Sequence, residues 1–299
     1  MRTLSIATEI LGKILHLSTF LGILRDLLRI RAFAVGLIGI LALTIFSLIG
    51  GLVTSYDRTY AGAFDPQLPP NPRNPLGTDL LGRDIYAQLI YGLSNSLAIG
   101  IIAGAIGTLL GTLIGITAGY FRGFVDSVLR LFIDVNLALP SMLVLVLIAS
   151  YFRGLDYIGM ALIICLFNWA WPARQVRAQT LSLRERDFIY LARLSNMGRF
   201  EILVREIMPH LTPWMVANFV NATISAILTE SGLSIIGLGP QRSMTLGMIL
   251  HWALSYAAIY RGLWWWWATP VIFLSIIFIF LYLIYMGITR YFAEREVFA

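Results

Sequence analysis

The chain has 299 residues, of which 58% are hydrophobic and 13% charged, and its mean hydropathy is +0.79. Soluble domains contain roughly 45–50% apolar and about 25% charged residues, so this composition excludes a water-soluble fold. The formal net charge is +6. The arginines lie beside apolar stretches, which argues against nucleic-acid binding and for membrane topology. The composition predicts an all-α membrane protein.

Residues 1–31 are expected to form an N-terminal interfacial amphipathic segment. The apolar stretch Ile6 to Ile30 is interrupted by charged residues, among them Glu9, Lys13 and Arg25. Such interruptions argue against a signal peptide or a full span, and they are typical of helices that lie in the plane of the membrane surface.

Residues 32–299 are expected to form one transmembrane domain with about six spans, because a spanning helix needs about 20 apolar residues. With the N-terminus inside, 16 of the 22 basic residues fall on the cytoplasmic side, as the positive-inside rule requires. Both termini and the loop 173–212 are therefore expected in the cytoplasm, and the loops 55–92 and 239–267 outside. The expected spans are Ala32–Thr54, Leu93–Gly119, Val128–Ser150, Ile158–Trp171, Pro213–Leu238 and Ala268–Ile288.

Glycines recur along the second expected span. Small residues four positions apart let two helices approach closely. The pattern predicts a tightly packed helix inside the bundle. The glycines are Gly100, Gly104, Gly107, Gly111, Gly115 and Gly119.

Two acidic residues fall inside expected spans, where ionisable groups are costly and are candidates for function. Asp134 follows Arg130 by four residues, a spacing that favours an ion pair on one helix. Glu230 has no basic neighbour in the sequence. Two interpretations of Glu230 stay open: a structural hydrogen bond across a helix interface, or contact with a transported substrate.

Polar residues at steps of three or four define one face of the fifth expected span. This face is expected to line either the translocation pathway or an interface with a second helix. Its members are Asn218, Asn221, Ser225 and Thr229, with Glu230 beside them.

The loop 173–212 is long and arginine-rich, and loops of this length usually have a function. Two apolar sets at helical spacing are separated by a break at 196–198, and Pro209 is expected to end the second. Two short helices of this kind suit a groove on a soluble partner, while an amphipathic pair resting on the membrane is the alternative. The sets are Phe188, Leu191, Ala192 and Ser195, then Phe200, Leu203, Val204 and Ile207. If they dock, Asp at Leu191 or Ile207 is expected to abolish docking without affecting membrane insertion.

The residues that carry most enzyme chemistry are scarce or scattered. Lys13, the only lysine, is followed by Ile14, so no phosphate-binding loop of the Walker type exists and ATP hydrolysis must come from a partner. The only cysteine, Cys165, lies in an apolar run and is expected to be a core residue. The three histidines are far apart in the sequence. We therefore expect neither a catalytic, metal nor cofactor site in this chain.

Three stretches resemble the second permease subunit of dipeptide and oligopeptide ABC importers. The segment 75–84 reads PLGTDLLGRD, close to the family's P-L-G-T-D-x-x-G-R-D. The segment 230–239 resembles the family's E-x-x-L-S-x-x-G-L-G ending of the fifth span. Part of the loop 173–212 resembles its ATPase-coupling loop. The coupling-loop positions are Asp187, Tyr190, Leu191, Ala192, Arg193, Asn196, Gly198, Ile207 and Pro209.

The coupling loop departs from the family pattern at three positions. Tyr190 and Leu191 stand where the family has Glu and Ala. Asn196 stands at the loop glycine, and Gly198 follows two residues later. These departures concern residue-level coupling, whereas the resemblance as a whole extends from about Leu76 to Gly239.

The resemblance implies a type I ABC importer permease fold in the cell membrane. It also implies a homologous second permease, two cytosolic ATPase subunits that bind ATP and Mg, and an extracytoplasmic substrate-binding protein. Oligopeptides or oligosaccharides are the implied substrates, and the sequence does not choose between them. Nickel import is a weaker alternative because no cluster of His or Cys lies near the pathway. A proton-coupled secondary transporter, with Asp134 and Glu230 as proton sites, is weaker still.

Overall fold

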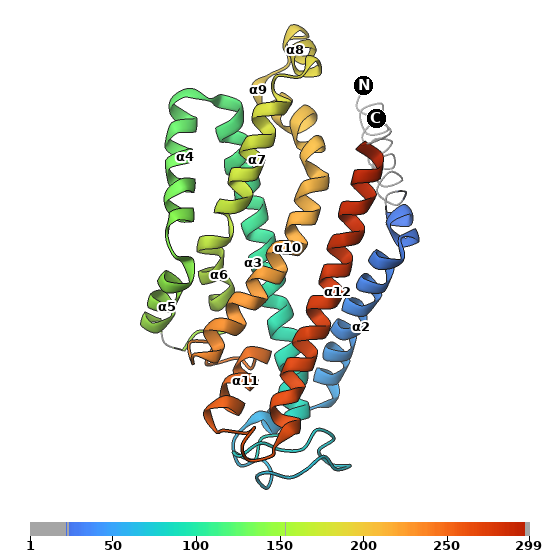
Figure 1. The fold of residues 1–299 in the computed structure, drawn as a ribbon, viewed down its shortest axis with the longest axis vertical. Helices are drawn as coiled ribbons and strands as arrows, with labels where there is room; N and C mark the ends of the chain where they lie inside the picture. Colours follow the sequence, from blue (N-terminus) through green and yellow to red (C-terminus); the bar gives the residue numbers. More distant parts are fainter. Residues whose placement is uncertain (1–21, 23, 153, 297–299) are drawn as a thin grey trace, which may run out of the picture.

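The computed structural model describes residues 22, 24–152 and 154–296. In these residues the regular structure is helical, apart from one isolated bridge between Thr78 and Asp84, and the expected all-α class is confirmed. Most of the expected interfacial segment 1–31 lies outside the described residues. The helices form an elongated bundle (Figure 1).

Four stretches of the described chain are long and apolar enough to cross a membrane, or five if a bent pair is counted as one span. They are α2 (Arg31–Val53), α3 (Ile85–Phe121), the stretch Arg199–Ile235 that ends in α10 (Met208–Ile235), and α12 (Trp264–Glu296). α3 has 37 residues and is about 55 Å long, more than a bilayer of about 40–45 Å. It begins at Ile85, inside the expected loop 55–92.

The third expected span is broken. α4 (Gly123–Ala138) and α5 (Ser141–Tyr151) meet at an angle of 82°. Between them, Pro140 has no N–H to donate, and the residue before a proline is disfavoured in helical conformation. Leu139 accordingly has φ −73° and ψ 136°. The local sequence therefore explains the bend.

The fourth expected span is also divided. α6 (Tyr157–Asn168) has 12 residues and is followed by α7 (Ala170–Leu183), which occupies the first part of the expected loop 173–212. Pro172 cannot donate a hydrogen bond to the carbonyl of Asn168, four residues earlier, which explains the break there. α6 and α7 run one after the other along α3 (Figure 1).

The glycines of α3 form the surface on which α6, α7 and α10 pack. A Cβ on Gly111 would lie 2.5 Å from the carbonyl oxygen of Trp169, and a Cβ on Gly115 would lie 2.6 Å from that of Ala173. Real Cβ atoms essentially never approach within 3.0 Å of such atoms. Gly104 meets Thr223 of α10 in the same way. The predicted close packing is confirmed.

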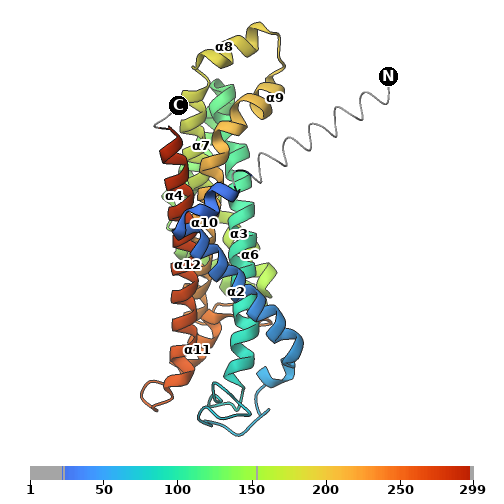
Figure 2. The ribbon, with the colours of Figure 1, turned by 90° about the vertical axis from the view of Figure 1, so that its right-hand side faces the viewer.

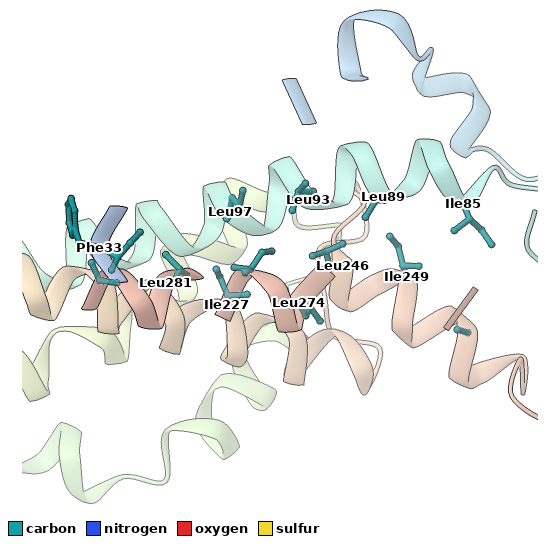
Figure 3. Close-up of a cluster of buried hydrophobic side chains, with 14 of the residues drawn as sticks. Phe33, Ile85, Leu89, Leu93, Leu97, Ile227, Leu246, Ile249, Leu274 and Leu281 are labelled. Atoms are coloured by element: carbon teal, nitrogen blue, oxygen red, sulfur yellow. The ribbon is translucent and has the colours of Figure 1, made fainter. Parts of the chain in front are cut away.

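The largest apolar cluster lies between α2, α3, α10, α11 (Leu246–Ser255) and α12 (Figure 3). Leu89, Leu93 and Leu97 of α3 point toward Ile227, Leu246 and Leu281. This cluster connects the helices around α3, and it leaves much of the apolar surface of α2 exposed on the outside of the bundle.

The bundle has two different ends (Figure 1). One end carries α8 (Asp187–Leu194), the beginning of α2 and the end of α12, and we name it the α8 end. The other carries the segment 55–84, with the short 3-10 helix Tyr56–Thr59, and we name it the loop end. α2 lies beside α12 near the α8 end and beside α3 near the loop end (Figure 2).

Candidate functional site

The segment that resembles an ATPase-coupling loop forms the tip of the α8 end (Figure 1). After α8 the chain turns into α9 (Arg199–Glu201), a π-helical stretch (Ile202–Ile207) and then α10. The break expected at 196–198 is present as a turn between α8 and α9. The tip is therefore joined to α10 without a flexible linker.

One face of this tip is buried and the other is exposed. Ile189 and Ala192 of α8 pack with Ile202 and Leu203 in an apolar cluster at the ends of α3 and α7. On the outside, Leu191, Leu194 and Phe200 are 63%, 83% and 78% exposed. Three large apolar side chains at the tip of a bundle present a surface that suits docking to a partner.

Ile207 does not belong to this exposed surface. Its side chain is fully buried against the same cluster. The expectation that Ile207 is presented to a partner is therefore wrong, and Asp at this position would bury a carboxylate among apolar side chains.

Pro209 does not end a helix, as was expected, but lies in the first turn of α10. Proline has no N–H to donate to the preceding turn, and the irregular π-helical stretch Ile202–Ile207 lies just before it. The π-helical stretch before it continues directly into α10.

Asn196, which stands where the family has glycine, has a backbone conformation that glycine adopts easily. Asn196 has φ +58°, in the left-handed region, which Asn tolerates better than other residues with a side chain. Gly198 has φ −64°, so its backbone is accessible to any residue. Asn196 therefore adopts a backbone conformation that is open to glycine and to Asn alike.

The charged residues around the tip hold α8 against the ends of α3 and α7. Glu185 accepts hydrogen bonds from Arg122, at 2.5 Å, and from the hydroxyl of Tyr190, at 3.2 Å. The guanidinium of Arg193 lies 6.0 Å from the ring centroid of Tyr120 and 5.8 Å from that of Tyr190. Tyr190, where the family has Glu, therefore takes part in positioning α8. Asp187 lies in the first turn of α8, where a negative charge is favourable.

The polar face of α10 is partly buried and partly exposed. Asn218 is buried and donates to the hydroxyl of Thr108 on α3 at 2.9 Å. Asn221 and Ser225 are exposed, and Thr229 donates to the Ser225 carbonyl. Asn218, Asn221 and Ser225 line a pocket of about 110 Å³ that also touches Asn168. The face therefore divides into an internal helix contact and a surface open to a partner or a pathway.

Glu230 lies in a closed hydrogen-bond cluster and not on that open surface. Its carboxylate accepts hydrogen bonds from the hydroxyls of Ser234 and Thr245, both at 2.6 Å, and the side chain is fully buried. Thr245 in turn caps α11, where it accepts from the N–H of Met248. The hydrogen bond across a helix interface that the first interpretation expected is therefore present, and it joins α10 to α11.

Asp134 forms the ion pair that the spacing predicted, with a second partner that the sequence did not indicate. Its carboxylate lies 3.4 Å from Arg130 of α4 and 2.6 Å from Arg174 of α7. On the same pair of helices, Asp126 accepts two hydrogen bonds from Arg177, at 2.5 and 2.7 Å. These pairs connect α4 to α7.

The PLGTDLLGRD segment forms a compact turn at the loop end. The fully buried carboxylate of Asp79 accepts from the backbone N–H groups of Leu81 and Arg83, at 2.8 and 2.9 Å, and from Nε of Arg83 at 2.5 Å. It also accepts from the amide of Gln88 on α3 at 3.1 Å. Gly77 has φ +72°, which explains why the motif needs glycine there.

Asp84 fixes the start of α3. Its side chain accepts from the N–H of Tyr86 as the helix N-cap and from Nε of Arg58 at 2.8 Å. The family resemblance identified the segment that contains Asp84. It did not indicate that Arg58, 26 residues before Asp84, would be its partner. No signal in the sequence linked them.

A pocket of about 210 Å³ lies beside this turn, lined by Tyr56, Tyr60, Arg83 and Trp252 among others. The guanidinium of Arg83 lies 5.1 Å from the ring centroid of Trp252. Burial raises the pKa of the Tyr56 phenol. The pocket therefore combines aromatic surface with one cation.

The chain is similar to the permease subunits of several ABC importers. Oligopeptide transport system permease protein OppC of Mycobacterium tuberculosis is 30% identical over 232 residues, which are 76% of this chain and 79% of that protein. Dipeptide transport system permease protein DppC of Bacillus subtilis is 30% identical over 243 residues, 81% and 75% of the two chains. Metal-staphylopine import system permease protein CntC of Staphylococcus aureus is 38% identical over 232 residues, 77% and 79%.

A solved structure shows the same fold. The inward-facing MetNI methionine ABC transporter matches with a TM-score of 0.55 and 18% identity, over 68% of this chain and 94% of the matched chain. The family model of the binding-protein-dependent transport system inner membrane component matches residues 111–297. This range includes the tip of the α8 end, the polar face of α10 and the Glu230 cluster. The chain is a multi-pass membrane protein and belongs to the family of binding-protein-dependent transport system inner membrane components, as the C-type permease subunit of a peptide-type ABC importer.

Proposed function

We propose that this chain moves oligopeptides into the cell, driven by ATP hydrolysis in two cytosolic ATPase subunits that bind the ATP and Mg. The observation that carries the proposal is the exposed apolar tip formed by Leu191, Leu194 and Phe200, at the family's coupling position. A homologous permease completes the pathway, and a binding protein delivers the substrate outside.

The connection between tip and membrane supports transmission of force. The stretch Arg199–Ile235 is helical throughout, and its π-helical part lies directly between the tip and α10. π-helical turns are rare in proteins, and those that occur often lie at functional sites. A movement imposed on α8 by a partner would therefore reach the polar face of α10, where Asn221 and Ser225 are exposed.

The proposed orientation places the α8 end in the cytoplasm and the loop end outside. Seven of the expected cytoplasmic arginines, from Arg174 to Arg205, lie on α7, on α8, in the connection between them and on the stretch that follows α8. The positive-inside rule then assigns that end to the cytoplasm. The cell membrane follows as the location.

Oligopeptides are favoured as substrate because OppC and DppC relatives at 30% identity span more than two thirds of this chain. The CntC relative, whose name gives a metal-staphylopine complex as cargo, makes such a complex the second candidate. Oligosaccharides remain an alternative from the sequence. The polar face of α10 carries amides and hydroxyls and no exposed charge, which suits the polar backbone of a peptide.

Docking is tested with Leu191→Asp in the complete importer. We expect the ATPase subunits to be lost on purification, while the permease pair remains in the membrane, because a carboxylate in an apolar contact is costly to desolvate. Ser182→Asp is the matched control, since Ser182 is exposed on α7 before the tip and receives the same charge. Normal ATPase co-purification with Leu191→Asp would contradict the proposal.

The substrate is tested by uptake into proteoliposomes that contain the permease pair, the ATPases and the binding protein. Labelled peptides, oligosaccharides and a metal–metallophore complex are compared in the presence of ATP. ATP-dependent uptake of peptides alone supports the proposal. Uptake of sugars or of the metal complex without uptake of peptides would overturn the substrate and leave the coupling intact.

A further inference from the structure

The contact between α2 and α12 leaves two depressions on the outside of the bundle. The first, about 480 Å³, lies at the α8 end between residues 29–32 and residues 286–294. The second, about 310 Å³, lies farther along the same two helices and is lined by Gly39, Ala42, Leu43, Phe46, Phe273 and Phe280. Neither depression belongs to the docking tip or to the polar face of α10.

The first depression is basic. Arg29, Arg31 and Arg290 line it together with one acidic residue, Glu294. Arg290 donates to Glu294 at 2.8 Å, and Arg29 lies 3.9 Å from Asp26. Arg31 takes part in none of the ion pairs found among the described residues. Counting Asp26, the guanidinium groups still exceed the carboxylates, so the depression attracts an anion.

The second depression is apolar. Its lining consists of two small residues, one leucine and three phenylalanines. The rings of Phe46 and Phe273 lie 6.5 Å apart and are nearly parallel, which closes the groove toward the loop end. A groove without polar groups, on a helix whose outer surface is mostly exposed and apolar, suits a hydrocarbon chain.

Both depressions lie on the same side of the helix pair. On α2, the residues Ala32, Val35, Gly39, Ala42 and Phe46 follow one another at steps of three and four, so they share one face. On α12, Phe273, Phe280, Gly287 and Glu294 are seven apart and also share a face. Val35, which is half exposed, lies between the two depressions. One elongated ligand can therefore reach both.

The separation matches one leaflet of a bilayer. From Ala32 to Gly39 the rise along α2 is about 10 Å. Half of a hydrocarbon core of about 30 Å is about 15 Å, so a head group beside Arg31 places its acyl chain at the groove. A basic pocket between membrane helices at the cytoplasmic side, continued by an apolar groove, matches an anionic head group with a chain.

We propose that the seam between α2 and α12 binds an anionic phospholipid, with its phosphate among Arg29, Arg31 and Arg290 and an acyl chain in the groove at Gly39–Phe46. The site is independent of the transported substrate. The lipid holds α2, which is otherwise the most exposed long helix, against α12.

The test measures lipid binding to the complete detergent-solubilised importer by native mass spectrometry and by thermal unfolding. Phosphatidylglycerol is expected to bind and to raise the unfolding midpoint, because a ligand of the folded state stabilises it by mass action. Phosphatidylcholine and glycerol phosphate, which lack the charge and the chain respectively, are expected to do neither.

Two variants separate the site from general charge. R29Q/R31Q removes two lining arginines and is expected to weaken phosphatidylglycerol binding about thirtyfold. R25Q/R186Q is the matched control, because both arginines are exposed at the α8 end, lie outside the depression, and carry the same total charge. An equal loss with both variants would show diffuse attraction and overturn the proposal.

The groove has its own pair of variants. Ala42→Phe fills it from an exposed position and is expected to weaken lipid binding, whereas Ile45→Phe, on a neighbouring exposed face, is expected to leave binding unchanged. Unchanged binding with Ala42→Phe, or equal binding of glycerol phosphate, would overturn the acyl-chain assignment. Lipid bound to the isolated chain but displaced in the complete importer would assign the seam to a subunit interface and overturn the proposal.

Discussion

The two ends of the bundle differ in what satisfies their side chains. At the loop end, Asp79 and Glu230 are fully buried, and each is surrounded by donors from its own chain. At the α8 end, the apolar side chains of Leu191, Leu194 and Phe200 are mostly exposed among the described residues. The loop end therefore pairs two buried carboxylates within the single chain, whereas the α8 end leaves apolar surface exposed, as the proposed docking to a partner requires.

The two family motifs are needed for different physical reasons, one at each end of the bundle. The PLGTDLLGRD segment encodes a turn, because its glycines, Asp79 and Asp84 fix the backbone and the start of α3. The coupling segment encodes a surface as well as a fold, because Ile189 and Ala192 of α8 face the cluster while Leu191 and Leu194 are exposed. Substitutions should therefore affect stability at the loop end and partner binding at the exposed face of the α8 end.

The largest effect is expected for Asp79→Ala. It leaves the buried Arg83 and two backbone N–H groups without their acceptor, and breaking a buried ion pair costs about 3–5 kcal/mol. Thermal unfolding of the purified chain measures the loss. Asp65→Ala, at an exposed position in the same loop, is the control and should change little. If Asp79→Ala and Asp65→Ala were equally stable, the buried hydrogen bonds of Asp79 would not stabilise the loop end, and the proposed difference between the two ends would be wrong.

Ile207→Ala and Leu191→Ala compare the buried and the exposed face of the α8 end. Ile207 is fully buried, so truncation is expected to lower the free energy of unfolding by about 3 kcal/mol. Leu191→Ala, at a position that is 63% exposed, should lie within about 0.5 kcal/mol of the wild type. Thermal unfolding is measured for both, together with ATPase co-purification, which Leu191→Ala should reduce. Similar unfolding midpoints would show that the inner face is not a core.

Glu230→Gln is expected to destabilise the chain by about 2 kcal/mol. The hydroxyls of Ser234 and Thr245 both donate to Oε1, and an amide oxygen is a weaker acceptor than a carboxylate oxygen. The new NH₂ group would face the Ser231 hydroxyl, which would then have to accept a hydrogen bond. Thermal unfolding and uptake are measured in parallel with Thr229→Ala, whose hydroxyl donates only to the backbone of its own helix. Loss of uptake at unchanged stability would contradict the structural role and return Glu230 to the pathway.

The smallest effect is expected for Asn196→Val. A β-branched residue at φ +58° should cost about 1 kcal/mol, whereas Asn196→Gly should be neutral. The unfolding midpoint and the ATPase activity of the importer measure both. A neutral Val would show that the turn does not need the left-handed conformation.

Several features were predictable because their causes are local. The hydropathy predicted a helical membrane protein, the glycine spacing predicted close packing of α3, and the spacing of Arg130 and Asp134 predicted their ion pair. The bend at Pro140 and the break before Pro172 follow equally local rules, although we expected continuous spans there. Proline acts on its own neighbours, so these breaks needed no tertiary information.

Other features depended on residues that are distant in the sequence. Helical spacing alone cannot say which apolar face of a short helix is buried, so Ile207 and Leu191 were expected to be equivalent. The partner of Glu230 is Thr245, which lies 15 residues away and beyond a loop. The partner of Asp84 is Arg58, and the second partner of Asp134 is Arg174 on another helix.

The class of the protein, the resemblance to peptide importers and the packing surface of α3 could be predicted from the sequence, because composition and short spacings encode them. The arrangement of the helices was needed to establish that Glu230 is enclosed and Leu191 exposed, and that basic and apolar depressions align along α2 and α12. Burial depends on which helices pack against a residue, and that arrangement is a property of the whole bundle.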